Sequence, residues 1–169
     1  YLIHGFTHGF RINYKGPPLS LLSKNHKSVN DHHDIVKAML IRELELGRIA
    51  GPFDEPPFPD FIVSPLGVGP KKNKANFVLF TNSTSVNSFI EPAEASVHHE
   101  PFACLVTLLQ RFGPGALLAK TDIEDAFRLI PIHESDHHLL GFQFDNKLYY
   151  DKCLPMGCRM SCHIFERFS

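Results

Sequence analysis

Five prolines between Gly51 and Pro65 restrict the fold of this chain more than any other feature. Proline lacks a backbone N–H, and its ring clashes with the preceding helical turn, so this stretch excludes an α-helix. The sequence FIVS (61–64) inside it predicts a short strand. The stretch therefore separates a helix predicted before it from strands predicted after it.

Helical periodicity is clearest immediately before the prolines. Apolar side chains recur at helical spacing over residues 31–46, the pair Asn30–Asp31 offers an N-cap, and Gly47 offers a stop. Two further helices are predicted over residues 101–112 and 158–168. We expect the first helix to pack against the core. Residues 1–30 are mixed in character and predict an extended arm.

Two hairpins are predicted from apolar runs that flank polar turns. The first, GVGPKKNKANFVLF (67–80), places Lys71, Lys72 and Lys74 near its tip. Those lysines fit either a solvated turn or a loop that holds phosphates by charge. The second, HLLGFQFDNKLYYDKC (138–153), turns at residues 145–147.

An apolar run from Ala116 to Ile123 predicts a central, buried strand. A short helical turn is predicted over residues 126–129, ending before Pro131. Residues 82–100 are polar and predict a loop. Together these elements indicate an α+β chain with a mostly antiparallel sheet, because no regular alternation of strands and helices is present.

Charge and composition exclude few classes of protein. Hydrophobic residues make up 43% of the chain, which is typical of a globular protein, and no apolar run reaches the ~20 residues of a membrane span. The 17 basic and 18 acidic residues give a net charge of −1, so no basic excess indicates a nucleic-acid partner. Because the sequence starts at Tyr1, we expect a piece of a longer protein.

Cysteine and histidine residues offer a weaker candidate site. The spacing C-x4-C-x3-C-H, formed by Cys153, Cys158, Cys162 and His163, is not a standard zinc pattern. This spacing is compatible with zinc binding and also with reduced intracellular thiols, in which case Cys104 is the fourth free thiol. The histidine pairs at 32–33, 98–99 and 137–138 are expected on the surface, since adjacent side chains point in different directions.

Asp122 lies at the end of the predicted buried strand. A buried carboxylate is costly without a partner, and a metal ion is one such partner. Mg²⁺ prefers oxygen ligands, and the backbone carbonyl of Ile123 offers a second one. The alternative is that Asp122 caps the following helical turn, since aspartate is a favoured N-cap.

Several blocks of the sequence resemble reverse transcriptases. TDIEDAFRLIPI (121–132) resembles motif A and LPMGCRMSCHIFERFS (154–169) resembles motif B, in the order found in that family. The blocks at 43–72, 116–142 and 149–158 are similar to polymerases of DIRS-type retrotransposons. The resemblance covers most of the chain and implies part of a right-hand polymerase that copies RNA into DNA.

The resemblance also implies roles for individual residues. Asp122 would bind catalytic Mg²⁺ in a two-metal site, with Ile123 donating its carbonyl. Asp125 and Ala126 would offer backbone N–H groups to the nucleoside triphosphate, and Phe127 would exclude a 2′-hydroxyl. A core role for Phe127 is the alternative. The remaining nucleotide-binding positions implied are Lys71, Lys72, Met156 and Gly157.

Three departures from the family pattern are visible. Val78 stands where the family has an arginine that would contact the triphosphate. The segment TNSTSVNS (81–88) is shortened; its Asn87 matches the family, whereas Ser88 replaces an aspartate. The Tyr-x-Asp-Asp motif and the thumb are absent from the sequence, so we expect no polymerase activity from this chain alone. A decayed or domesticated copy and an unrelated α+β binding module are the alternatives.

The implied division of the chain follows from the motifs. It comprises an N-terminal arm (1–30), fingers (31–95), palm with motif A (96–131), a fingers hairpin (132–152) and the start of palm motif B (153–169). The implied partners are an RNA or DNA template–primer and deoxynucleoside triphosphates, with no membrane. The expected location is intracellular, in the cytoplasm or nucleus.

Overall fold

The computed structural model describes residues 1–71, 77–91, 100–119 and 122–167. Its elements are, in chain order, α1 (Leu2–His8), β1 (Leu21–Leu22), α2 (Lys27–Asp31), α3 (His33–Glu45), β2 (Ile49–Phe53), β3 (Ile62–Val63), β4 (Leu66–Pro70), β5 (Phe77–Thr81), α4 (Thr84–Asn87), α5 (Phe102–Phe112), the 3₁₀ helices η2 (Ala126–Leu129) and η3 (Glu134–Leu139), β6 (Gly141–Phe144), β7 (Lys147–Asp151) and α6 (Arg159–Glu166).

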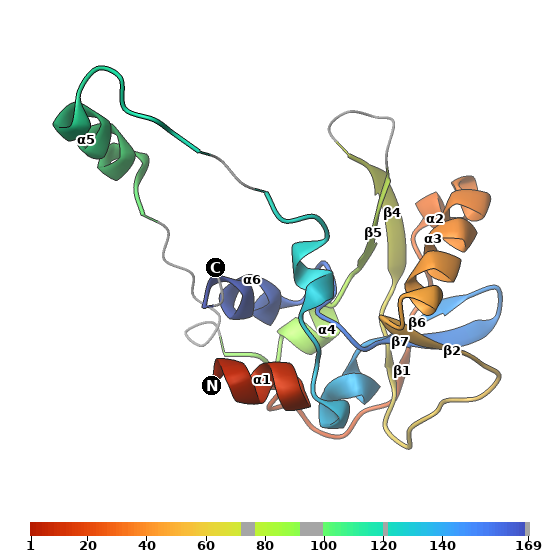
Figure 1. Cartoon of the computed structure of the whole chain (residues 1–169). Coiled ribbons are helices and arrows are strands. Elements are labelled where there is room, and N and C mark those ends of the chain that lie inside the picture. The colour runs from red at the N-terminus through yellow and green to blue at the C-terminus, as the bar shows by residue number, and fades with distance from the viewer. Residues whose placement is uncertain (72–76, 92–99, 120–121, 168–169) are drawn as a thin grey trace.

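The strands form one mixed sheet and one separate hairpin (Figure 1). The sheet has the order β1-β3-β6-β7-β2; its two pairings that involve β3 are parallel and the other two are antiparallel. Strands β4 and β5 pair with each other in an antiparallel hairpin. Antiparallel pairing therefore predominates, and the predicted α+β class is confirmed.

Two hydrophobic clusters hold these elements together. One gathers around Ile130, Leu154 and Ile164, which are fully buried. The other lies between α3 and the strands, where Val36 and Leu40 meet residues such as Phe142. Burying each such side chain stabilises the fold by about 1.5–3 kcal/mol, so these two clusters fix how α3 and the sheet pack.

The helix predicted over residues 31–46 is present as α3, which begins two residues later, at His33, and follows a separate short helix, α2, that ends at Asp31. The backbone of His32 leaves the helical region, with φ −128° and ψ 37°, and this residue divides α2 from α3. The far boundary is as predicted, because α3 ends at Glu45 and Gly47 takes a positive φ of 67°. Glycine adopts that left-handed conformation without a steric cost, which suits the end of a helix.

Both predicted hairpins are present. In β4–β5 the register pairs Leu66 with Thr81 and Pro70 with Phe77, and the predicted tip residues Lys72 and Lys74 lie outside the described residues. In β6–β7 the turn residues Asp145 and Asn146 both have positive φ, of 49° and 57°. Two consecutive left-handed residues match the twist of a two-residue hairpin, and asparagine and aspartate tolerate this conformation.

The prediction of an extended N-terminal arm is wrong. The segment begins with helix α1, and Phe10 and Ile12 after it are buried in the first hydrophobic cluster. Backbone hydrogen bonds join Phe10 to Pro131 and to His133, at 2.9 and 3.0 Å. The segment thus folds onto residues more than 100 positions away, a pairing that local sequence patterns do not reveal.

The buried strand predicted from Ala116 to Ile123 is also wrong. Residues 114–119 and 122–123 form no strand, and Leu117 is 99% exposed. A strand needs a neighbour for its backbone hydrogen bonds, and within the described ranges no strand pairs with this segment. The apolar side chains therefore stay on the surface.

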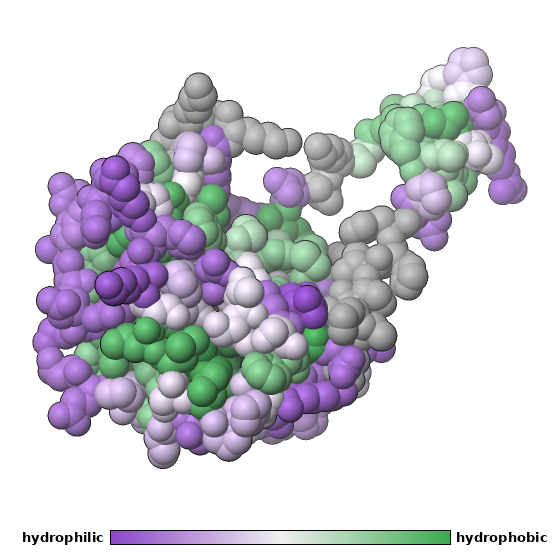
Figure 2. All heavy atoms as spheres, turned by 180° about the vertical axis from the view of Figure 1, so that it is seen from behind, coloured by the Kyte–Doolittle hydropathy of each residue, from purple (hydrophilic) through white to green (hydrophobic). Residues whose placement is uncertain are grey.

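Helix α5 has the predicted length but little burial. Figure 1 shows it standing away from the sheet, and none of its residues is buried. Its apolar side chains and those of the following segment form the largely green lobe in Figure 2, which includes Leu105, Leu108 and Leu118.

The polar loop predicted over 82–100 contains the short helix α4. Among the described residues, no helix is long and apolar enough to cross a membrane.

Candidate functional site

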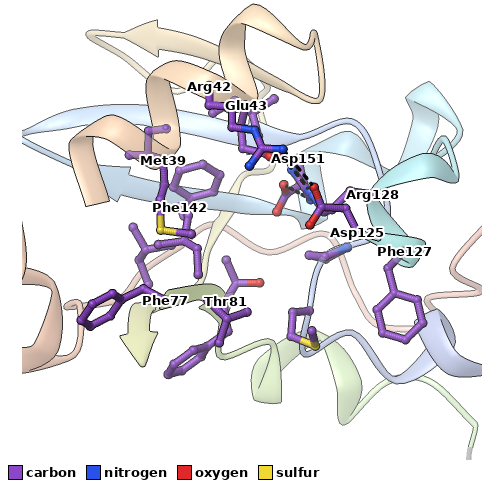
Figure 3. Close-up of a pocket in the computed structure, with 18 of the residues that line it drawn as sticks. Met39, Arg42, Glu43, Phe77, Thr81, Asp125, Phe127, Arg128, Phe142 and Asp151 are labelled. Carbon is purple, nitrogen blue, oxygen red and sulfur yellow. Dashed lines mark hydrogen bonds and ion pairs between the residues drawn. The ribbon is translucent and has the colours of Figure 1, made fainter. Parts of the chain in front are cut away.

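A cavity of about 370 Å³ lies between α3, the β4–β5 hairpin and the segment that contains η2 (Figure 3). Its two ends differ in chemistry. Met39, Phe77 and Phe142 lie toward one end, whereas charged side chains from α3, η2 and β7 gather at the other. The cavity therefore combines an apolar wall with a polar one, which is the usual character of a ligand site.

The cavity collects most of the residues proposed from the sequence. Those that line it are Lys71, Ile123, Asp125, Ala126, Phe127 and Met156. These residues come from three segments that are far apart in the chain. Asp122 directly precedes Ile123 and is exposed, Gly157 directly follows Met156, and Lys72 lies outside the described residues.

The turn around Asp125 has an unusual backbone. Asp125 takes the left-handed conformation, with φ 52° and ψ 36°, and immediately precedes η2. Its carbonyl accepts a hydrogen bond from the Arg128 N–H at 2.7 Å. Because Asp125 is the residue that caps η2, the alternative role of Asp122 as that N-cap is not supported by the structure.

Phe127 faces both the cavity and the core. Its ring packs against the first hydrophobic cluster and meets Phe165 edge to face, with 5.7 Å between ring centroids. It is only partly buried, and Figure 3 shows it at the edge of the cavity. The two interpretations of Phe127 are therefore compatible, because a ring that packs on one side presents the other side to a ligand.

Met156 and Gly157 join the segment after β7 to β5 and α4. The Thr81 N–H donates to the Met156 carbonyl at 3.2 Å, and the Asn87 side chain donates to the Gly157 carbonyl at 2.8 Å. Gly157 has a positive φ of 113°, and a Cβ atom there would lie 2.2 Å from the Thr81 carbonyl oxygen. Glycine is thus required for a close approach to the protein's own backbone.

A charge cluster that the sequence analysis missed forms the polar wall. It consists of Glu43, Arg48, Asp125, Arg128 and Asp151. Arg128 donates two hydrogen bonds to Glu43, at 2.8 and 2.9 Å, and one to Asp151 at 2.6 Å. Arg48 bridges Glu43 and Asp125, at 3.4 and 3.1 Å. No local pattern could reveal these pairs, since their members lie on separate elements.

Burial and pairing shift the pKa values inside this cluster. Burial lowers the pKa of Arg128, but the charges of Asp151 and Glu43 outweigh this effect and leave the pKa above its ordinary value. Burial raises the pKa of the Asp151 carboxyl, and the paired Arg128 opposes that shift. Arg128 is therefore a permanent cation that stabilises the charged forms of two poorly solvated acids.

The other candidate sites do not assemble. All four cysteines are free thiols, and across residues 1–71, 77–91, 100–119 and 122–167 no three metal-binding side chains gather. His137 is buried, against the prediction of a surface residue, and its Nε2 lies 3.1 Å from the Ile132 carbonyl oxygen. Its ring stacks on Tyr150, so it has a structural role. His98 and His99 lie outside the described residues.

Comparison with known proteins links the fold to one group of enzymes. No family model matches the sequence, and no curated protein matches it. Many solved structures do match, and three of them are foamy virus protease–reverse transcriptases. The native enzyme of prototype foamy virus gives a TM-score of 0.65 at 15% identity, over 94% of this chain and 20% of that chain.

The other two structures give similar TM-scores and identities. A selenomethionine-labelled mutant of the prototype foamy virus enzyme gives a TM-score of 0.64 at 16% identity, over 92% of this chain and 19% of its own. A foamy viral form in complex with double-stranded DNA gives 0.65 at 14% identity, over 91% and 25%. The chain therefore has the fold of part of a reverse transcriptase, and it spans a quarter or less of these neighbours.

Proposed function

We propose that this chain is the fingers and the first part of the palm of an RNA-directed DNA polymerase, which adds deoxynucleotides to a primer. One observation carries the proposal. Residues that motifs A and B and the fingers loop supply as nucleotide ligands line a single cavity, although they come from three distant segments. The likeness of fold to foamy virus reverse transcriptases supports the same conclusion.

The proposed nucleotide site places the phosphates near Lys71 and the turn at Asp125. The backbone N–H groups of Asp125 and Ala126 would bind the triphosphate as neutral donors, and Lys71 would add a positive charge. Phe127 would lie against the sugar and exclude a 2′-hydroxyl by steric contact. Met156 and Gly157 would lie next to the base, where Gly157 lets the backbone approach Thr81 closely and so positions Met156.

We propose Mg²⁺ as the metal at Asp122. The Asp122 carboxylate is exposed and is followed by the carbonyl of Ile123, and oxygen donors of these two kinds suit Mg²⁺. One or two carboxylates plus substrate phosphates are the usual ligands of this ion in phosphate-transfer enzymes. When bound, Mg²⁺ would supply charge stabilisation to the phosphoryl transfer. The chain's own contribution would be one carboxylate and one carbonyl.

A DIRS-type retrotransposon is the source that we propose for the chain. The blocks at 43–72, 116–142 and 149–158 support this assignment by their resemblance. A template–primer of RNA or DNA would be the partner of the complete enzyme. The foamy viral neighbour in complex with double-stranded DNA is compatible with such a partner.

A decayed or domesticated copy is the second candidate. It is favoured by Val78, which lines the cavity with an apolar side chain where the family pattern has an arginine. Losing a charge-assisted hydrogen bond to a phosphate costs about 1.5–3 kcal/mol of binding free energy. Such a copy would keep the fold and bind nucleotides weakly or not at all.

Nucleotide binding by the 169-residue chain distinguishes the two candidates. We expect saturable, Mg²⁺-dependent binding of fluorescently labelled dATP, displaced more readily by unlabelled dATP than by ATP because of Phe127. Asp122→Asn should weaken binding in the presence of Mg²⁺, whereas Asp60→Asn, which removes an exposed carboxylate elsewhere, should not. A folded chain that binds no dATP would favour the decayed copy.

A further inference from the structure

We propose that Arg42 on α3 is a second phosphate-binding cation of this cavity and acts together with Lys71 on a polyphosphate ligand. The inference rests on the proposed function, since it assigns the ligand's phosphates to the polar end of the same cavity. Neither motif A nor motif B contains Arg42, and its position on the fingers helix gives no sign of this role in the sequence.

The cations around the cavity differ in how closely carboxylates of the protein already bind them. Among the described lining residues they are Arg42, Lys71 and Arg128. Arg128 is largely buried, and all three of its guanidinium nitrogens donate to Glu43 or Asp151. The Arg42 side chain is 62% exposed, and within the described part of the chain its ion pair is with Asp125, at 3.7 Å. That distance is too long for a hydrogen bond.

The charge cluster holds Arg42 in place indirectly. Its neighbour in the sequence, Glu43, is fixed by Arg128, which sets the rotation of the last turn of α3 against η2. Asp125 is bound more closely by Arg48, at 3.1 Å, so this carboxylate does not depend on Arg42 for a partner. Arg42 can therefore turn from Asp125 to an incoming phosphate without leaving a carboxylate unpaired.

The wall formed by β5 carries no charge, so a cation from α3 is needed to bind a triphosphate. Strand β5 contributes Phe77, Val78, Leu79, Phe80 and Thr81 to the cavity, all of them uncharged. Among the described lining residues, the positive charge available to a triphosphate then comes from Lys71 and from α3. Arginine is suited to this because its planar guanidinium donates two parallel hydrogen bonds to a phosphate. Arg42 would compensate for the arginine that Val78 replaces.

The test compares two ligands and four proteins. Binding of dATP and of inorganic triphosphate, both with Mg²⁺, is measured by titration calorimetry on the 169-residue chain and on Arg42→Gln, Arg42→Lys and Lys37→Gln. Lys37 is an exposed cation on the same helix and does not line the cavity, so Lys37→Gln controls for net charge and for helix changes. Circular dichroism confirms that each variant is folded.

Arg42→Gln should weaken binding of both ligands roughly tenfold, the loss expected for a charge-assisted hydrogen bond at a partly exposed site. Arg42→Lys should recover part of the affinity, and Lys37→Gln should match wild type. If wild type binds dATP and Arg42→Gln binds it equally well, the inference is wrong while the proposed function stands.

The reverse outcomes are also distinct. Binding of inorganic triphosphate that depends on Arg42 would support the phosphate site. If dATP then bound no more tightly than inorganic triphosphate, the polymerase assignment would be contradicted. A folded wild-type chain that binds neither ligand would overturn both.

Discussion

Arg128 follows Phe127 in the sequence, and nothing in the surrounding residues indicates which side chains it pairs with in the structure. Its guanidinium joins two carboxylates that lie 85 and 23 positions away, on α3 and β7. Both acids are largely removed from water; Asp151 is paired with Arg128, and Glu43 with Arg128 and, at a longer distance, with Arg48. This one side chain therefore links α3, the β6–β7 hairpin and η2.

Replacing Arg128 by Met should lower the free energy of unfolding by about 3 kcal/mol, because the buried Asp151 loses this partner and Glu43 keeps only the longer contact with Arg48. Urea denaturation followed by circular dichroism measures the change. Arg111→Met, which removes an exposed arginine from α5, is the matched control and should have little effect. Equal stability of the two variants would show that the cluster contributes no net stabilisation.

Gly157 offers a second prediction at the scale of a residue. Gly157→Ala should cost more than 2 kcal/mol, since the new Cβ would meet the Thr81 carbonyl in addition to adopting a positive φ. Gly47→Ala separates the two causes, because Gly47 also has a positive φ but has no atom within 4 Å of a Cβ. That variant should cost about 1 kcal/mol. If thermal unfolding shows equal losses, the contact with Thr81 is not restrictive.

At the scale of elements, a histidine joins the start of α3 to the β6–β7 turn. The Nε2 atom of His33 lies 2.8 Å from an Asp145 carboxylate oxygen, and its ring stacks on Phe144. The hydrogen bond that protonated His33 donates to Asp145 raises the pKa of His33 above its ordinary value. The folded chain therefore holds the His33 proton more tightly than the unfolded chain does.

This linkage predicts a dependence of stability on pH. The stabilisation should be fully present below the unfolded histidine pKa of about 6.5 and lost as pH rises through the raised pKa of the folded state. Burial lowers the pKa of His137, which has the opposite effect at low pH. The difference between wild type and His33→Gln isolates the first effect. It should shrink between pH 6 and pH 8, and a constant difference would contradict the linkage.

Helix α5 and helix α3 should respond differently to the same substitution. Leu40 on α3 is 3% exposed in the second cluster, so Leu40→Ala should cost about 3 kcal/mol. Leu108 on α5 is 47% exposed, and Leu108→Ala should cost less than about 0.5 kcal/mol. Chemical denaturation measures both. A large loss for Leu108→Ala would mean that α5 packs against the body of the protein.

At the scale of the whole molecule, the described residues supply one wall of the proposed catalytic centre. The chain spans 19–25% of the foamy virus structures that share its fold, and its own candidate metal ligands are Asp122 and Ile123. A two-metal mechanism needs further carboxylates on the opposite side of the substrate. We therefore expect this chain to bind nucleotides without catalysing their incorporation.

Primer extension tests this separation. With a template–primer, Mg²⁺ and the four deoxynucleoside triphosphates, the 169-residue chain should incorporate no nucleotide. A reverse transcriptase of known activity serves as the positive control for the reaction. Incorporation that disappears in Asp122→Asn would contradict the expectation and would show that the 169-residue chain suffices for catalysis.

Local patterns in the sequence determined helices α3, α5 and α6, both hairpins and the grouping of candidate ligands by motif. Periodicity and turn residues such as Asp145 and Gly47 act over a few positions, so they are visible without tertiary contacts. The tertiary structure alone decided which distant charges pair around Arg128, and that Phe10 and Ile12 enter the core. It also left Leu117 exposed, because an apolar run becomes a strand only beside another strand. Pairing and burial depend on neighbours that the local sequence does not specify.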